Sequence, residues 1–429
     1  MTTATGRRLN IVWNSVAPWI PSGYGQQTAL TTVRLRNAGH NVAISAFAGF
    51  EGTIGEWQGM TVYPCDTTRF NKYALRKYVE RHSADGTGDD VLVITLQDVW
   101  TWLDNSPRTG GLPADYRGLR IAAWCPVEHD PIPANTVQAL EAFGARPIAM
   151  SKYGRERMQQ AGLDPLYVPH GIDTTALQPN TSAAEQVREA LGVSRDAFIV
   201  GMVAHNQGMS PCRKSFPEVF QAFSMFLEDH PESILYLHTD VLGLNEGINL
   251  TALWRRFAIP DENVRFVNQD KYWLGEITQE QMGYMYSALD VLACPSYGEG
   301  FGIPLIEAQA CGTPVITTDW TSMTELVGPG WLVDGDPWYN PGSASFWKRP
   351  AISELIGALE KAYEAKGDQA ISAACREFAL AYEVDKVFAE HWVPTLEALS
   401  KPREVPPLPT LNRETRRARI KAAKQRTAA

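Results

Sequence analysis

Two glutamates that lie eight positions apart, Glu299 and Glu307, flank a turn with glycines at 300 and 302. Carboxylates accept hydrogen bonds from hydroxyl groups, but they repel phosphate. These residue types therefore indicate two sites for ligand hydroxyls, one on each side of the turn. The glycines would let a ligand approach the backbone between the acids, because glycine carries no side chain.

The segments around this turn predict a strand, a glycine loop and a helix. Residues 291–294 form an apolar run that is typical of a buried strand. Pro304 suits the first turn of the helix, and Gly312 suits its end. This geometry directs backbone N–H groups and the positive end of the helix toward one point, which favours phosphate. A ligand with a diphosphate in the middle and hydroxyls at both ends is a nucleotide sugar.

The segment from Tyr297 to Val315 resembles the Glu-(seven residues)-Glu signature of family 4 glycosyltransferases, which have the GT-B fold. The resemblance implies that Glu299 binds the donor sugar and that Glu307 binds the ribose. It also implies that amides of the turn grip the sugar hydroxyls or the phosphate. The donor contacts expected in this segment are Gly300, Phe301, Gly302, Ile303 and Leu305.

A second glycine loop lies between an apolar run at 9–13 and a helix-like stretch at 26–38. Its glycines, Gly23 and Gly25, do not have the Gly-x-Gly-x-x-Gly spacing of dinucleotide-binding proteins, which disfavours a dehydrogenase. The loop is similar to the first glycine loop of the family. The resemblance therefore implies that its amides approach the donor phosphate from the N-terminal domain.

Arg213 and Lys214 are adjacent cations in the second half of the chain. Cleavage of a sugar–diphosphate bond develops negative charge on the leaving group, and fixed cations stabilise that transition state. The family carries an Arg and a Lys in this region, so the resemblance implies this catalytic role. It also implies retention of configuration by a front-face route, in which the departing phosphate takes the acceptor proton. Two solvated cations at the start of a helix are the alternative.

Polar side chains also follow strand patterns in the first half. The cluster Glu128-His129-Asp130-Pro131 resembles a loop in which many family members place a His or Asp near the reacting centre. The resemblance implies catalytic roles for His129 and Asp130, while capping of the next helix is the alternative. Asp98 is a further candidate for the cleft. His170 lies in a segment similar to the interdomain turn of the family, where ligand contact and a structural role are both open.

The segment Asp334-Gly335-Asp336 has the spacing of the metal-binding Asp-x-Asp found in the other large glycosyltransferase fold. It follows an apolar run at 331–333, late in the second half and beyond the donor site. We therefore interpret it as a turn. No other cluster in the sequence has metal-ligand spacing, so we predict no essential metal and no cofactor.

The remaining pattern predicts two doubly wound α/β domains. The chain has 429 residues, 44% of them hydrophobic, which exceeds one comfortable domain. Strand-like runs alternate with helix-like stretches, as in a parallel sheet with helices on both faces. The expected strands are 9–13, 41–47, 91–96, 121–124, 147–150, 197–203, 233–237, 264–267, 290–294 and 315–317. Ligands should bind at the carboxyl ends of these strands, in the cleft between the domains.

We predict an N-terminal, acceptor-side Rossmann-like domain at 1–180 and a nucleotide-sugar donor domain at 181–383. A helix at 384–400 should cross back to the first domain, as in the family. The segment 401–429 is basic and proline-rich, and we predict that it is disordered. It carries nine Lys or Arg and two Glu, a net charge of +7, whereas the other 400 residues carry −16 of the total of −9. A solvated tail and a tail that contacts an anionic partner are both open.

Cysteine usage and hydropathy bear on the compartment. The six cysteines lie far apart and form no Cys-x-x-Cys pair, which indicates a reducing environment. The sequence has no run of about 18 apolar residues. Its first residues lead straight into a strand pattern without an apolar leader. We therefore predict a cytoplasmic protein without a transmembrane segment.

These observations and the resemblance predict a retaining, metal-independent glycosyltransferase. It would move a hexose from UDP- or GDP-hexose to a hydroxyl acceptor, such as a glycan or a protein, that the sequence does not identify. Two alternatives stay open. One is a sugar-nucleotide epimerase or a phosphorylase of the same fold. The other is a non-enzymatic scaffold that binds sugar nucleotides.

Overall fold

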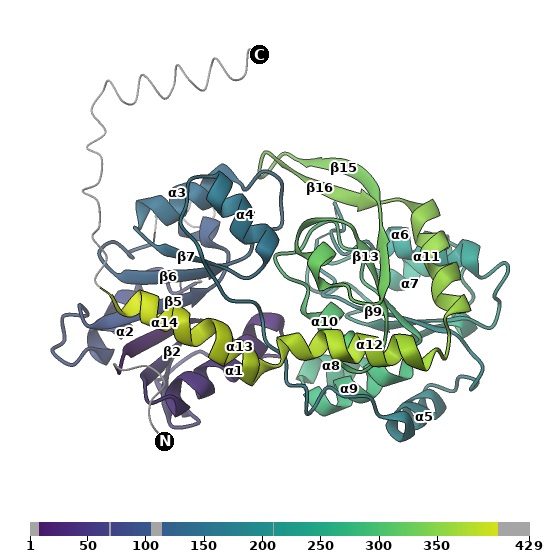
Figure 1. Cartoon of the computed structure of the whole chain (residues 1–429), viewed down its shortest axis with the longest axis horizontal. Coiled ribbons are helices and arrows are strands. Elements are labelled where there is room, and N and C mark those ends of the chain that lie inside the picture. The colour runs from purple at the N-terminus through teal and green to yellow at the C-terminus, as the bar shows by residue number, and fades with distance from the viewer. Residues whose placement is uncertain (1–7, 68–69, 104–113, 209, 402–429) are drawn as a thin grey trace, which may run out of the picture.

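The computed structural model describes residues 8–67, 70–103, 114–208 and 210–401. Two mainly parallel β-sheets lie side by side, each with helices packed against it, and the last helices of the chain run along both (Figure 1). The prediction of an α/β protein with two doubly wound domains is confirmed. The tail from residue 402 onward lies outside the described residues, so its disorder stays a prediction.

The first sheet has eight strands in the order β3-β4-β2-β1-β5-β6-β7-β8. The strands are β1 (Asn10–Val16), β2 (Asn41–Ala48), β3 (Gly55–Trp57), β4 (Met60–Tyr63), β5 (Val91–Leu96), β6 (Arg120–Cys125), β7 (Arg146–Ala149) and β8 (Leu166–Tyr167). Every residue of β5 is buried, as expected for a central strand that is covered on both faces. The helices are α1 (Gly23–Asn37), α2 (Ala74–His82), the 3-10 helix η1 (Val99–Trp102), α3 (Ala134–Ala142) and α4 (Lys152–Gln160).

The second sheet has six parallel strands in the order β11-β10-β9-β12-β13-β14. They are β9 (Ile199–Val203), β10 (Ile234–His238), β11 (Val264–Phe266), β12 (Val291–Ala293), β13 (Val315–Thr318) and β14 (Gly330–Val333). The helices of this half are α5 (Thr181–Ala190), α6 (Phe216–Phe226), α7 (Leu250–Arg256), the 3-10 helix η2 (Asp261–Asn263), α8 (Gln269–Leu274), α9 (Gln279–Ala288), α10 (Ile303–Ala310), the 3-10 helix η3 (Thr321–Leu326), α11 (Ile352–Glu364) and α12 (Gln369–Ala379). The proposed domain boundary after residue 180 falls between the last strand of the first sheet and the first strand of the second.

Each sheet has a point where the strand order reverses. β1 lies between β2 and β5, and β9 lies between β10 and β12. Loops that leave neighbouring strands at such a point run to opposite faces of the sheet, which opens a crevice at the carboxyl ends of the strands. The loops after β1, β5, β6, β9 and β12 carry the candidate residues. The topology therefore brings together side chains that are far apart in the sequence.

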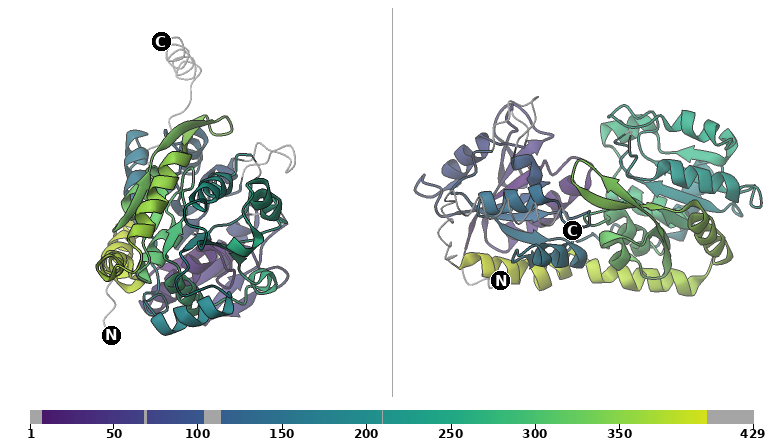
Figure 2. Two further views of the ribbon diagram at one scale, coloured as in Figure 1. Left: turned by 90° about the vertical axis from the view of Figure 1, so that its right-hand side faces the viewer. Right: turned by 90° about the horizontal axis from the view of Figure 1, so that it is seen from above.

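An antiparallel hairpin of β15 (Gly335–Asn340) and β16 (Ser345–Pro350) was not expected. It projects over the junction of the two sheets (Figure 2). The interpretation of residues 334–336 as a turn was wrong, because Gly335 opens β15. A Cβ at Gly335 would lie 1.9 Å from the carbonyl oxygen of Arg349 on the partner strand. The glycine therefore serves close strand pairing rather than a turn.

The last helices cross from the second domain to the first (Figure 1). They are the 3-10 helix η4 (Leu380–Tyr382), α13 (Val384–Val387), a π-helical turn (Phe388–Trp392) and α14 (Val393–Ser400). The ring of Trp392 lies 5.7 Å from that of Trp13 and 5.0 Å from that of Trp124. This end of the chain therefore completes the core of the first domain.

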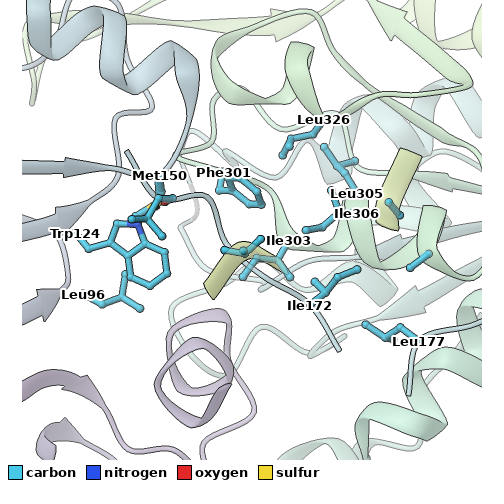
Figure 3. Close-up of a cluster of buried hydrophobic side chains, with 14 of the residues drawn as sticks. Leu96, Trp124, Met150, Ile172, Leu177, Phe301, Ile303, Leu305, Ile306 and Leu326 are labelled. Atoms are coloured by element: carbon cyan, nitrogen blue, oxygen red, sulfur yellow. Dashed lines mark hydrogen bonds between the residues drawn. The ribbon is translucent and has the colours of Figure 1, made fainter. Parts of the chain in front are cut away.

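A continuous cluster of buried apolar side chains joins the two domains. Trp124 and Met150 enter it from the first domain, and Phe301 and Ile303 enter it from the second (Figure 3). Burial of apolar surface thus holds the domains together at the base of the cleft. Within the described ranges, every helix is too short or too polar to span a membrane.

Candidate functional site

The glycine turn lies between β12 and α10, as predicted. Gly302 precedes the helix with φ of +118°, a left-handed conformation that favours glycine. Pro304 lies in the first turn, and Gly312 follows the last one. A side chain at Gly300 would bring its Cβ to 2.2 Å from the Cβ of Pro126. The glycine at 300 therefore lets the first domain approach the turn, a role that the sequence did not suggest.

Glu299 contacts both of the cations predicted to hold the leaving diphosphate. Its Oε2 accepts a hydrogen bond from Arg213 Nη1 at 3.0 Å, and its Oε1 accepts one from Lys214 Nζ. Burial by itself raises the pKa of Glu299, but the charges of Arg213 and Lys214 outweigh burial and lower the pKa to about 2. The acid is therefore ionised at neutral pH, and the three residues form one charged group.

The loop between β9 and α6 delivers the two cations to the turn. Ser215 adopts a left-handed φ of 57° directly before α6, and its Oγ donates to the carbonyl of Pro295 at 2.5 Å. The backbone N–H of Tyr297 donates to the carbonyl of Arg213 at 2.8 Å. These two hydrogen bonds tie the cation loop to the segment that follows β12.

Two acids of the first domain enter the same group. Glu128, in the loop after β6, places its Oε2 at 3.2 Å from Arg213 Nη1. Burial is the largest cause that raises the pKa of Glu128 to about 7; Arg213 opposes it, and Asp98 and Glu299 add to it. Burial also raises the pKa of Asp98, against the charge of Arg213. The place of Asp98 in the cleft stays a prediction.

His129 and Asp130 lie on a different side of the same loop. The His129 ring stacks on Trp347 of β16 with 4.9 Å between ring centres. The carboxylate of Asp130 accepts a hydrogen bond from Arg157 Nη1 at 3.3 Å. The hairpin, which the sequence did not reveal, thus stacks on the ring of His129, whereas the carboxylate of Asp130 turns to α4. Their catalytic roles stay predictions, and the structure directs Glu128 to Arg213 in their place.

Glu307 is buried in α10 and bridges the domains. Its Oε1 accepts from the side-chain amide of Gln26 at 2.9 Å, and its Oε2 accepts from the hydroxyl of Tyr286 at 2.8 Å. Burial raises its pKa, and these two hydrogen bonds oppose the rise. Gln26 begins the second turn of α1 in the first domain. Each oxygen that would receive a ribose hydroxyl thus already accepts one hydrogen bond from the protein.

The first glycine loop faces α10. A Cβ at Gly25 would lie 2.2 Å from the carbonyl oxygen of Ile20, so only glycine fits this tight entry to α1. Ser22 caps the helix by accepting from the Gly25 N–H at 3.1 Å. A Cβ at Gly23 would lie 3.2 Å from the side chain of Ile303, the first residue of α10. The N-termini of α1 and α10 therefore converge, and converging positive helix ends favour an anion.

Three predicted residues lie in the apolar core between the domains. His170 is 2% exposed, and its ring lies 4.5 Å from that of Trp124 and 5.0 Å from that of Phe301. Burial lowers the pKa of His170 to about 3, so the ring is neutral. Phe301 and Leu305 are equally buried. The packing favours a structural role for His170, and it leaves the backbone of the turn as the part that can meet a donor.

The sequence placed Glu128 in a loop near the reacting centre but gave it no role, and it missed several groups that support the two signature acids. The Glu299 N–H donates to Thr321 Oγ1 at 3.1 Å, and Ser322 Oγ donates to the Glu299 carbonyl at 2.7 Å. Gln26 directly follows the first glycine loop, which is a usable signal. Tyr286 carries no motif, because its role depends on how α9 packs against α10.

The Asp-x-Asp segment is engaged elsewhere. Asp334 accepts a hydrogen bond from Lys348 Nζ at 2.7 Å, and Asp336 lies in β15. Among the residues that the structure describes, no three His, Cys, Asp or Glu side chains gather as a group that could hold a metal ion. Metal independence stays a prediction that chelation can test.

Known proteins resemble this chain in sequence and in fold. Residues 265–335 match the family model of glycosyl transferases group 1. A D-inositol 3-phosphate glycosyltransferase from Corynebacterium jeikeium is 32% identical over 176 residues, which cover 40% of each chain. A second one, from Catenulispora acidiphila, is 30% identical over 215 residues, which cover 48% of this chain and 45% of that protein. The chain thus spans less than half the length of these relatives.

Solved structures match over nearly the whole chain. Sucrose-phosphate synthase from Thermosynechococcus elongatus has a TM-score of 0.65 at 18% identity and covers 92% of this chain and 100% of that one. HepE from Anabaena, solved in complex with UDP-glucose, has a TM-score of 0.61 at 18% identity and covers 90% of this chain and 99% of that one. The chain therefore has the GT-B fold, and its second domain carries the segment that characterises group 1 glycosyltransferases.

Proposed function

We propose that this chain is a retaining, metal-independent glycosyltransferase that moves a hexose from UDP- or GDP-hexose to a hydroxyl acceptor. The observation that carries the proposal is the position of Glu299 between Arg213 and Lys214, directly before a helix that also bears Glu307. A nucleoside diphosphate sugar needs these parts: cations for the diphosphate and carboxylates for the hydroxyls at either end. The resemblance in fold to HepE, which was solved with UDP-glucose, supports a UDP donor.

In this proposal the diphosphate lies at the converging N-termini of α1 and α10. Arg213 and Lys214 then share their charge between Glu299 and the diphosphate. Glu299 accepts hydrogen bonds from the sugar, and Glu307 accepts them from the ribose. The side-chain amide of Gln26 competes with the ribose for one oxygen of Glu307, because that oxygen already accepts a hydrogen bond from it.

The proposed reaction breaks the donor at its anomeric carbon and depends on the two cations. The bond between the anomeric carbon and the diphosphate breaks, and its electron pair leaves with the nucleoside diphosphate. Arg213 and Lys214 stabilise the charge that develops on the leaving group more than the charge of the bound donor. The acceptor oxygen bonds to the anomeric carbon on the face that the diphosphate leaves, so the configuration is retained.

The test uses the full chain with UDP-, GDP- and ADP-hexoses. One of these donors should raise the thermal midpoint, and slow release of nucleoside diphosphate and free hexose should follow with water as acceptor. Phosphate-dependent release would indicate a phosphorylase, and interconversion of the sugar without release would indicate an epimerase. Binding without turnover would favour the scaffold. Loss of turnover in chelator with recovery in manganese would overturn metal independence.

A further inference from the structure

The carboxylate of Glu128 is part of the charged group that joins the two domains. Its Oε2 lies 3.2 Å from Arg213 Nη1, and the same nitrogen lies 3.0 Å from Oε2 of Glu299. One guanidinium nitrogen is therefore shared by a carboxylate of each domain. The Glu128 side chain is 23% exposed, so a small ligand in the cleft can reach it.

The charges around Glu128 do not balance. The titratable and charged groups that act on it or respond to it are Tyr24, Asp98, Arg213, Lys214 and Glu299. Three carboxylates, those of Asp98, Glu128 and Glu299, act on only two cations, Arg213 and Lys214. Glu299 takes hydrogen bonds from both cations, so the excess negative charge falls on Asp98 and Glu128. Burial is the largest cause that raises the pKa of Glu128, and the like charges of Asp98 and Glu299 add to the rise. Glu128, with a pKa of about 7, can both accept and release a proton near neutral pH.

The loop that carries Glu128 is held in place from the other domain. The Asp130 N–H donates to the Phe346 carbonyl at 3.1 Å, and the Phe346 N–H donates back to the Asp130 carbonyl at 2.8 Å. A Cβ at Gly298 would lie 2.4 Å from the carbonyl oxygen of Glu128. The hairpin and the signature turn therefore fix Glu128 relative to Glu299. A fixed position at the reacting centre is what proton transfer requires.

We propose that Glu128 is the general base that takes the proton of the acceptor hydroxyl. The inference rests on the proposed function and adds a residue to it. In a transfer with retention through one face, the acceptor hydroxyl lies on the same side of the sugar as the departing diphosphate. The base must therefore lie beside the group that holds the diphosphate, and Glu128 contacts Arg213 directly. A nucleophile would have to lie on the opposite side of the sugar.

The step balances without another reactant. The acceptor oxygen forms a bond to the anomeric carbon while the bond from that carbon to the diphosphate oxygen breaks. The electron pair of the broken bond leaves with the nucleoside diphosphate. The hydroxyl proton passes to a carboxylate oxygen of Glu128, which later returns it to water. Glu128 thus takes the proton that the front-face route otherwise assigns to the departing phosphate.

The experiment compares wild type with Glu128→Gln and Glu128→Asp. The measured reaction is release of nucleoside diphosphate from the UDP- or GDP-hexose that wild type hydrolyses, because water as acceptor also loses a proton. Glu128→Gln should lower kcat by about 100- to 10,000-fold while donor binding changes little. The acid limb of the pH profile of kcat, which falls below about pH 7 as Glu128 is protonated, should disappear. Glu128→Asp should keep the limb with an intermediate rate.

A matched control is Glu360→Gln, which removes a carboxylate paired with His230 outside the cleft. It should retain the wild-type rate and pH profile. An unchanged kcat or a retained acid limb in folded Glu128→Gln would overturn the base role while the proposed function stands. Loss of donor binding in this variant would also overturn it and make Glu128 a binding residue. Wild type that releases no nucleoside diphosphate from any donor would reject the proposed function itself.

Discussion

Arg213 is the residue on which the charges of the site converge. Its guanidinium reaches Glu299 in its own domain, Glu128 in the other domain and the carbonyl of Gly298 at 2.5 Å. A planar guanidinium presents five N–H donors in a fixed geometry, so it can bind several partners at once. The cation therefore combines two roles, since it neutralises the acids and connects the domains.

Replacing Arg213 with Ala should raise the barrier to donor cleavage by about 2.7–4 kcal/mol, because a preorganised charge at the leaving group is lost. Arg213→Lys should be intermediate, since it keeps the charge and loses the planar fork. The measurement is kcat for donor hydrolysis. Arg195→Ala is the control, because it removes an exposed arginine that pairs with Glu185. Equal turnover in Arg213→Ala and wild type would contradict the role.

The depressed pKa of Glu299 predicts a dependence of stability on pH. Its pKa falls from 4.5 to about 2 in the folded chain. The ionised form is therefore favoured by folding, and this contribution is present above about pH 4.5 and is lost as the pH falls toward 2. The difference in unfolding free energy between wild type and Glu299→Gln should shrink over this range. Denaturant titrations at several pH values measure it, and a constant difference would refute the linkage.

Glu307 should determine affinity for the nucleotide. Glu307→Ala should weaken binding of the free nucleoside diphosphate by about 1.5–3 kcal/mol, the value of hydrogen bonds to a charged group. Gln26→Ala should tighten binding, because the ribose then meets a carboxylate oxygen that no protein amide occupies. Calorimetry measures both. Unchanged affinity in Glu307→Ala, or weaker affinity in Gln26→Ala, would show that these residues do not exchange partners on binding.

At the scale of elements, the turn before helix α10 contacts two loops, the loop after β9 that carries the cations and the loop after β6 in the first domain. The turn presents Glu299 to the cations, and its glycines admit the loop after β6. The hairpin of β15 and β16 then covers that loop from the other side. The family match ends at residue 335, where β15 begins. The hairpin thus lies outside the matched segment, although it contacts the loop that carries Glu128.

Gly300→Ala should therefore act on the domain junction. Its new Cβ would lie 2.2 Å from the Cβ of Pro126, so the loop after β6 must move away. We expect a lower thermal midpoint and weaker donor binding. Gly357→Ala is the control, because that position lies inside α11 with nothing within 4 Å of an added Cβ. It should stabilise the chain by about 0.5–1 kcal/mol. Wild-type stability and donor affinity in Gly300→Ala would show that the junction tolerates the shift.

At the scale of the whole molecule, the chain returns to its first domain after building its second. Trp392 packs against both Trp13 and Trp124, and Arg34 pairs with Asp385 at 2.6 Å. The two domains are therefore connected twice by the chain, in addition to the apolar cluster between them. Movement of one domain against the other has to bend both connections.

Trp392→Ala should destabilise the first domain by about 3–5 kcal/mol, because it leaves a cavity in a fully packed core. The second domain has its own core, so its unfolding should change less, and two transitions should separate in a thermal scan. Trp273→Ala is the control, since that ring is 47% exposed. A single transition at the wild-type midpoint in Trp392→Ala would refute this view of the C-terminal helices.

The amino-acid pattern alone predicted the two parallel sheets and the strand–turn–helix around Glu299. Apolar periodicity, glycine and proline are local signals, and they report on elements that form within a few residues. The resemblance to the family added the expectation that Glu299, Glu307, Arg213 and Lys214 act together on the donor.

Only the tertiary structure decided which side chains of the first domain meet this group. Glu128, His129 and Asp130 are adjacent in sequence, yet the hairpin binds the last two and leaves Glu128 beside Arg213. Likewise, Gln26 and Tyr286 reach Glu307 only because α1, α9 and α10 pack at the junction. These contacts join residues that are distant in sequence, and their pKa values depend on burial and on neighbouring charges that no local pattern records.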